Sequence, residues 1–97
     1  MRKVIFLSPA EEEMLETARF YESQATGLGD DFQAEVQRMV QSILLHPNAG
    51  SLLSEEIRRR ILRKFPFGIL YAVEPDSIII VAVMHLRRKP YYWKDRF

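Results

Sequence analysis

The chain has 97 residues, of which 47% are hydrophobic and 28% charged, with a formal net charge of +1; this balance favours one folded soluble domain over residues 1–97 and excludes a disordered chain. The absence of cysteine excludes disulfides, cysteine-ligated zinc and thiol nucleophiles. The longest apolar run, residues 78–84, is far below the roughly 18 residues of a membrane span, and the start is too short for a signal peptide, so we expect a cytoplasmic protein.

The small net charge hides an uneven distribution. Residues 1–56 carry four basic and ten acidic side chains, whereas residues 57–97 carry ten basic and three acidic ones, giving net charges of −6 and +7. Such a division indicates a surface that meets an anion, an acidic partner or nucleic acid. Equally, the two halves can neutralise each other across an internal interface.

The N-terminal half predicts a strand followed by two helices. Residues 2–7 form a short apolar run bounded by a turn signal, which is typical of a strand. Ser8 is a good helix cap and Pro9 suits the first helical position, so a helix is expected to follow. Residues 26–29 interrupt this helix, and a second one is expected from Asp30 until the proline that follows His46. The short link predicts an antiparallel helical hairpin.

Three strands are then expected to form an antiparallel meander. They span residues 57–65, 67–73 and 78–85, and the second is apolar on both faces, as in a central strand. The strand at residues 2–7 can join the same sheet while the helical hairpin covers one face. The sequence therefore predicts an α+β two-layer fold in the order β-α-α-β-β-β.

The first strand of this meander carries an unusual concentration of cations. Alternation along an uninterrupted strand over residues 57–65 places Ile57, Ile61 and Phe65 on one side. Arg58, Arg60 and Lys64 are then expected on the face that the helices leave open. Solvated charges that protect a sheet edge are the alternative explanation.

Residues 85–96 form the most unusual segment of the chain. They combine five cations, three aromatic rings and a histidine. Guanidinium groups pair with phosphates and rings stack on bases, so this composition suits single-stranded nucleic acid; a tail whose rings pack on the sheet is the alternative. His85 can act as an acid or base at neutral pH, or be satisfied by backbone carbonyls at the strand end. Phosphate-loop, serine-nucleophile and metal motifs are absent from the sequence, so we expect no cofactor and no metal.

Three motifs taken together resemble the RelE/ParE toxin superfamily, and in particular its ParE-like plasmid-stabilisation members. They are Phe65-Pro66-Phe67-Gly68-Ile69-Leu70-Tyr71, the aliphatic run 78–84 that ends in His85, and Arg88-Lys89-Pro90-Tyr91-Tyr92-Trp93. The upstream helical segments fit as well, so the resemblance covers nearly the whole chain. It implies two helices on a curved antiparallel sheet, and a bacterial toxin that a cognate antitoxin wraps and neutralises.

The resemblance leaves the target open. RelE-like members cut mRNA in the ribosome, and ParE-like members poison DNA gyrase. Metal-independent RNA cleavage would need a base, cations and an acid, for which the candidates are His85, Arg60, Arg63, Arg87, Arg88 and Tyr91. The sheet glutamate of YoeB-like relatives is missing between residues 57 and 73. The motifs are closer to ParE, so we expect gyrase poisoning and growth arrest, with an inactive relative that only binds its partner as a third hypothesis.

For target binding we expect the cations and rings of the strand and the tail to act together. The candidates are Arg58, Arg60, Lys64, Arg88, Lys89, Tyr92, Trp93 and Arg96. The antitoxin is expected to contribute an amphipathic, acid-bearing segment that counters the basic half and forms a hetero-oligomer.

Overall fold

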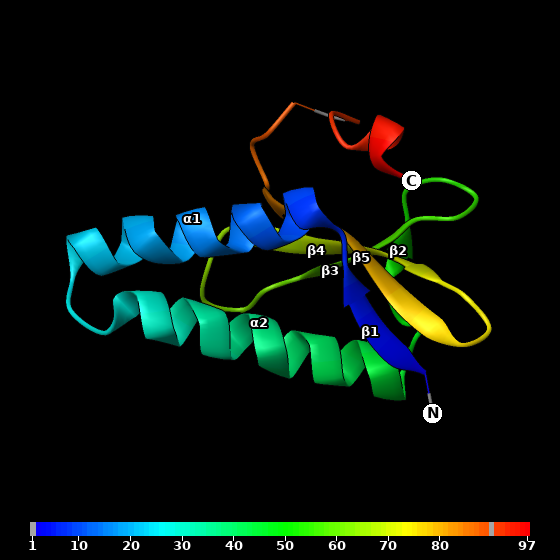
Figure 1. The fold of residues 1–97 in the computed structure, drawn as a ribbon, viewed down its shortest axis with the longest axis horizontal. Coiled ribbons are helices and arrows are strands. Elements are labelled where there is room, and N and C mark those ends of the chain that lie inside the picture. The colour runs from blue at the N-terminus through cyan, green and yellow to red at the C-terminus, as the bar shows by residue number, and fades with distance from the viewer. Residues whose placement is uncertain (1, 90) are drawn as a thin grey trace.

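The computed structural model describes residues 2–89 and 91–97, which form two helices packed on a five-stranded sheet (Figure 1). In chain order the elements are β1 (Lys3–Phe6), α1 (Ser8–Gln24), α2 (Leu28–Leu45), β2 (Ser51–Leu52), β3 (Arg58–Ile61), β4 (Phe67–Val73), β5 (Ser77–His85) and a 3₁₀ helix, η1 (Lys94–Arg96). The predicted α+β fold is confirmed, with β2 as an additional short strand at one edge.

The sheet has the strand order β1-β5-β4-β3-β2 and is mixed. The neighbours from β5 to β2 pair antiparallel, as the meander predicts, but β1 pairs parallel to β5, with Lys3 opposite Ser77 and Phe6 opposite Ile80. The expectation of an antiparallel sheet therefore needs correction at this edge. The helical hairpin and the meander separate β1 from β5, so no short turn forces the two strands to run in opposite directions.

The helix α1 begins directly after β1. Leu7 is still extended, because its amide donates to the carbonyl of Ile80 at 3.0 Å, and it is the residue that precedes the helix. Ser8 is already helical and makes no side-chain capping bond, so the predicted cap at Ser8 is wrong. Pro9 lies in the first turn, where its missing N–H costs no helical hydrogen bond.

The helix α2 begins at Leu28, two residues before the position predicted from its acidic residues. Gly27 precedes it with a φ of 87°, a conformation that favours glycine. The carboxylate of Glu22 accepts hydrogen bonds from the amides of Gly27 at 2.9 Å and Gly29 at 3.0 Å, and so satisfies two of the free amides at the helix start. Neither long helix in the described part of the chain has the apolar stretch that a membrane span requires.

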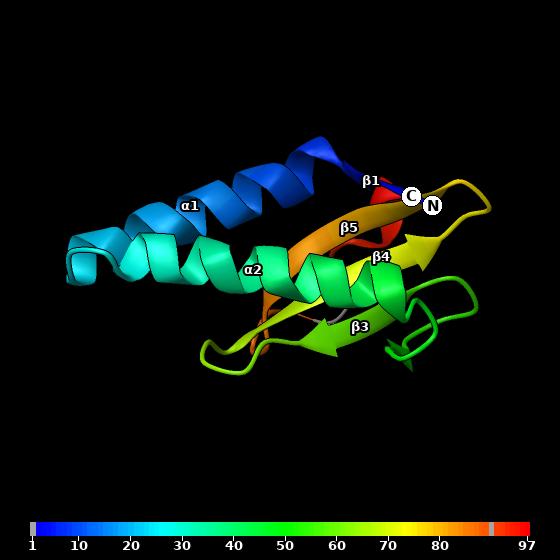
Figure 2. The same ribbon diagram turned by 90° about the horizontal axis from the view of Figure 1, so that it is seen from below.

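Both faces of the sheet are apolar, and each has its own cluster of buried side chains. Phe32 and Val36 of α2 pack with Ile69 and Tyr71 of β4 in the helix-side cluster. On the opposite face, Trp93 of the C-terminal tail closes a second cluster; its other members are Ile57, Leu70, Ala72, Val81, Ala82 and Met84. Figure 2 shows the helices in front of the sheet and the red end of the chain behind β5. We therefore distinguish a helix side from a tail side.

Candidate functional site

Two of the predicted cations of β3 point to the helix side. The guanidinium of Arg58 donates to the carbonyls of Asn48 at 3.0 Å and Gly50 at 2.8 Å, at the end of α2. Arg60 donates to the hydroxyl of Ser42 in α2 at 3.2 Å. Lys64 also borders side chains of α2. The expectation that Arg58, Arg60 and Lys64 project from the face left open by the helices is therefore wrong.

The error comes from where β3 ends. Ile57 is buried in the tail-side cluster, but Leu62 and Phe65 are buried in the helix-side cluster. The strand stops at Ile61, and the turn that follows carries Phe65 to the other side of the sheet. Alternation in the true strand places Arg59, which the prediction passed over, on the tail side.

Arg59 lies across the tail side of the sheet, over Gly68 of β4. A Cβ atom at Gly68 would stand 3.1 Å from both Cγ and Cδ of Arg59, so the missing side chain makes room for the arginine. Arg59 borders a pocket of about 170 Å³, together with Leu53, Met84, Leu86, Arg88, Tyr91 and Trp93. We call this the tail-side pocket. A glycine in an otherwise bulky central strand was the sequence signal that a neighbouring side chain crosses there.

The tail brings several predicted residues to this pocket, but in different roles. The Arg88 guanidinium carbon lies 4.0 Å from the centroid of the Tyr92 ring, a cation–π contact, and Arg88 itself is exposed. Tyr91 is 55% exposed and Trp93 only 5%, although their ring centroids are 5.6 Å apart. Trp93 is therefore a core residue as well as a wall of the pocket. Arg87 and Lys89 are exposed and are not among the residues that line the pocket.

Tyr92 and Arg96 are bound to Glu13 of α1. The Tyr92 hydroxyl donates to one carboxylate oxygen at 2.5 Å, and Arg96 donates to both oxygens at 2.8 Å and 3.0 Å. Burial, with the hydrogen bond to Glu13 and its negative charge, raises the pKa of Tyr92 far above its usual range. The hydrogen bond to Glu13 also raises the pKa of Arg96. Both residues thus hold the tail against α1.

His85 lies half-buried at the end of β5, as predicted. Its ring centroid is 5.1 Å from that of Phe67, and its Nδ1 accepts a hydrogen bond from the amide of Arg87 at 3.0 Å. An imidazole nitrogen that accepts an N–H carries no proton, so the neutral ring has its proton on Nε2. In this tautomer Nδ1 is engaged by the Arg87 amide and Nε2 carries the ring proton, so neither nitrogen offers a free lone pair for a base.

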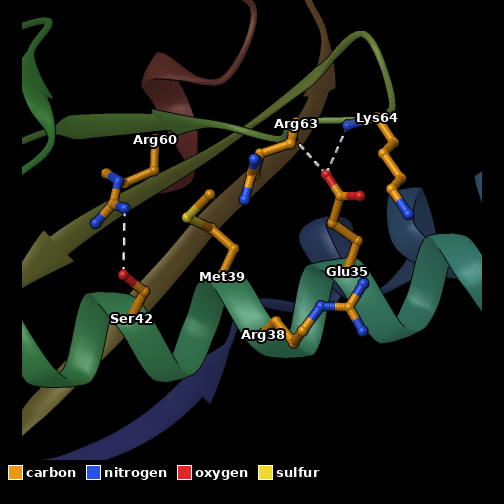
Figure 3. Close-up of a pocket in the computed structure, with 7 residues that line it drawn as sticks. All are labelled: Glu35, Arg38, Met39, Ser42, Arg60, Arg63 and Lys64. Carbon is orange, nitrogen blue, oxygen red and sulfur yellow. Dashed lines mark hydrogen bonds between the residues drawn. The ribbon is translucent and has the colours of Figure 1, made fainter.

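The predicted catalytic candidates are divided between the two sides. Arg60 and Arg63 border a groove of about 770 Å³ between α2 and β3, shown in Figure 3. Its other lining residues are Glu35, Arg38, Met39, Ser42 and Lys64. We call this the α2–β3 groove. Arg88 and Tyr91 line the tail-side pocket. The structure thus defines two cationic surfaces on opposite faces of the sheet.

The turn after β3 is held by a buried acid that no sequence pattern had indicated. Glu35 is 6% exposed, and one of its carboxylate oxygens accepts hydrogen bonds from the amides of Arg63 at 2.5 Å and Lys64 at 2.9 Å. In Figure 3 the dashed lines from Glu35 reach the backbone of these two residues. Within residues 2–89 and 91–97, no group of three histidine or carboxylate side chains is placed to hold a metal ion.

The chain is thus a small two-layer α+β protein with a cationic pocket on one face of its sheet and a cationic groove on the other. The chain belongs to the family of ParE toxins of type II toxin–antitoxin systems (parDE), whose model matches residues 4–90. The resemblance inferred from the sequence motifs is confirmed.

A solved structure with a similar fold is described as a chromosomal ParDE TA system from P. aeruginosa. The two chains superpose with a TM-score of 0.70 at 17% sequence identity, over 88% of this chain and 96% of that one. At this identity the match establishes the fold. No curated protein sequence matches the chain.

Proposed function

We propose that this chain is a cytoplasmic ParE-type toxin that arrests growth by binding DNA gyrase through the tail side of its sheet, and that a cognate antitoxin neutralises it. The observation that carries this proposal is the tail-side pocket, where Arg59 and Arg88 meet the exposed ring of Tyr91. Guanidinium and aromatic groups around a pocket are typical of sites that bind protein or nucleic-acid partners.

The geometry favours binding over RNA cleavage. The cations proposed to stabilise a reacting phosphate are split, with Arg60 and Arg63 on the helix side and Arg88 on the tail side. The hydrogen bond from the Arg87 amide occupies Nδ1 of His85, so the imidazole lacks the free acceptor that a general base needs. A toxin that acts by occupying its target does not need such a catalytic set.

The test is an assay of the purified chain on two targets. With gyrase and supercoiled plasmid we expect trapped DNA cleavage, which Arg59→Ala and Arg88→Ala should weaken at least tenfold. Arg19→Ala removes an exposed cation of α1 and serves as the control, with no expected change. Intact DNA together with cleavage of ribosome-bound mRNA would instead establish the endoribonuclease. Unimpaired growth on expression without antitoxin would leave a relative that only forms a complex.

A further inference from the structure

The α2–β3 groove carries an uncompensated positive charge. Four of its lining side chains are cations, contributed by α2, by β3 and by the turn after it: Arg38, Arg60, Arg63 and Lys64. In the part of the chain that the structure describes, the one ion pair joins Arg96 to Glu13, beside β5 and not beside β3. The cations of the groove thus have no carboxylate partner among the described residues.

The single acid of the groove does not change this balance. One carboxylate oxygen of Glu35 is bound by the amides of Arg63 and Lys64, and the side chain is buried. Glu35 fixes the turn, and it thereby fixes where the two cationic side chains that follow β3 leave the backbone. The groove keeps its net positive charge.

Arg60 differs from the other three cations, which are exposed, because part of its guanidinium is buried. Its Nη2 donates to Ser42, whereas its Nη1 is buried and has no hydrogen-bond partner among the described residues. A buried, unpaired donor on a charged group is costly, and native structures rarely keep one without a reason. A rotation of the guanidinium toward an anion in the groove would give up one bond to a neutral hydroxyl and replace it with charge-assisted bonds.

The shape of the groove indicates a polypeptide. Its volume of about 770 Å³ is continued along α2 by a second hollow of about 270 Å³, which shares Glu35, Arg38 and Lys64 with it. This hollow extends to Leu28, Asp31 and Phe65, so its far end carries one acidic side chain. Met39 and the stems of the cations give it apolar surface between the charged ends. A single small anion would fill a fraction of this volume.

We propose that the α2–β3 groove is the docking site for an acidic, amphipathic segment of a partner polypeptide. One carboxylate pairs with Arg60 beside Ser42, a second lies near Arg38, and an apolar side chain between them covers Met39. The identification of this partner as the antitoxin rests on the proposed function. The groove and the tail-side pocket lie on opposite faces, so a segment bound in the groove does not itself occupy the pocket.

The groove is tested with the purified chain and a capped peptide of alternating glutamate and leucine. We expect saturable NMR shifts at the amides of Arg38, Ser42 and Arg60, which weaken as ionic strength rises. The matched peptide with glutamine for glutamate should bind at least tenfold more weakly. Inorganic phosphate should not produce the same saturation at equal charge concentration; if it does, the polypeptide assignment is wrong.

Variants then distinguish specific binding in the α2–β3 groove from nonspecific electrostatic attraction to the protein. Arg60→Gln and Arg38→Gln should each weaken binding of the glutamate peptide about tenfold, whereas Arg19→Gln, with the same change in net charge, should leave it unchanged. Arg38 is exposed, so Arg38→Gln tests the groove even if Arg60→Gln perturbs the fold. Equal weakening by all three variants, or shifts confined to the tail side, would overturn the proposal. The peptide-binding measurements use neither growth nor gyrase. They can therefore be interpreted even if the toxin assay fails, and the toxin assay can be interpreted even if the peptide does not bind.

Discussion

Glu13 and Arg96 form a bidentate ion pair beside β5, at the edge opposite β4, where the described residues provide no further partner strand. The partner strand β1 reaches only as far as Ile80. Beyond that point the Glu13 carboxylate accepts from the amide of Val83 at 3.1 Å, and Arg96 donates to the carbonyl of Val81 at 3.2 Å. The pair therefore satisfies edge groups of β5 and ties the tail to α1 at the same place.

We expect Glu13→Gln to destabilise the protein by about 2 kcal/mol, because a partly buried arginine loses its charged partner. Glu12→Gln, on the exposed side of the same helical turn, is the control and should change the free energy of unfolding by less than about 0.5 kcal/mol. Urea unfolding followed by the fluorescence of the single tryptophan, Trp93, measures both. Equal urea midpoints for the two variants would show that the pair contributes nothing.

Alkaline pH should destabilise the folded chain through Tyr92. Its pKa is raised in the folded state by burial and by Glu13, so above pH 10 the unfolded chain releases a proton that the folded chain keeps. The stabilising contribution of Tyr92 is fully present below pH 10, which is close to the pKa of tyrosine in the unfolded chain. Above this pH the free energy of unfolding falls by up to about 1.4 kcal/mol for each pH unit.

The matched variant is Tyr92→Phe, which lacks the ionisable hydroxyl. It should be less stable than the wild type at pH 8, where it lacks the hydrogen bond to Glu13, and this difference should shrink at pH 11. Unfolding midpoints at the two pH values provide the measurement. A difference that stays constant or grows between pH 8 and pH 11 would contradict the assigned direction of the pKa.

Alanine variants of Arg88 and Trp93 should differ in how strongly they destabilise the fold. Arg88→Ala removes an exposed side chain and should change stability by no more than about 1 kcal/mol, the size of its cation–π contact with Tyr92, while it weakens growth arrest. Trp93→Ala opens a cavity in the tail-side cluster and should cost about 3 kcal/mol or more. Thermal unfolding and growth arrest measured in parallel decide this. A stable Trp93→Ala variant would refute the core role of the ring.

Gly68→Ala should act through Arg59. The new methyl group needs the space that Cγ and Cδ of Arg59 occupy, and the flexible side chain can move away, so the fold should be retained within about 1 kcal/mol. Growth arrest should fall as far as in Arg59→Ala, and the double variant should be no weaker than either single one. Additive losses in the double variant would mean that Gly68 acts independently of Arg59.

Local patterns were sufficient for most of the elements. The range 67–73 of β4 matches the prediction from its apolar run, and β5 begins one residue earlier, at Ser77. These strands are buried on both faces, so their sequences carry a strong signal that does not depend on distant partners. The family motifs lie mainly in these strands and the tail, which is why the resemblance was visible.

The faces of β3 could not be predicted because they depend on a distant residue. The strand ends where Glu35 binds the amides of Arg63 and Lys64, and these are 28 and 29 positions away from it in the sequence. If the strand continued without that break, the spacing of Ile57, Ile61 and Phe65 would place all three side chains on the same face of the sheet. A buried acid on the apolar face of α2 has no local signature, since an amphipathic pattern tolerates one glutamate at its boundary.

The tail was correctly singled out by composition, but the roles of its residues were not accessible. Tyr92 and Arg96 are directed by Glu13, which lies 79 and 83 positions away in the sequence. From their composition alone such residues are assigned to a binding surface. In the structure they make stabilising contacts with the distant carboxylate of Glu13.

The parallel pairing of β1 with β5 also sets the order of events during translation. Because β1 has no partner strand other than β5 in the described part of the chain, a nascent chain carries β1 unpaired until β5 has left the ribosome. The wall that Trp93 adds to the tail-side pocket emerges later still. Almost the whole polypeptide has therefore left the ribosome before the surface that we propose to arrest growth can form. During this time a partner protein can bind the basic segments before that surface is complete.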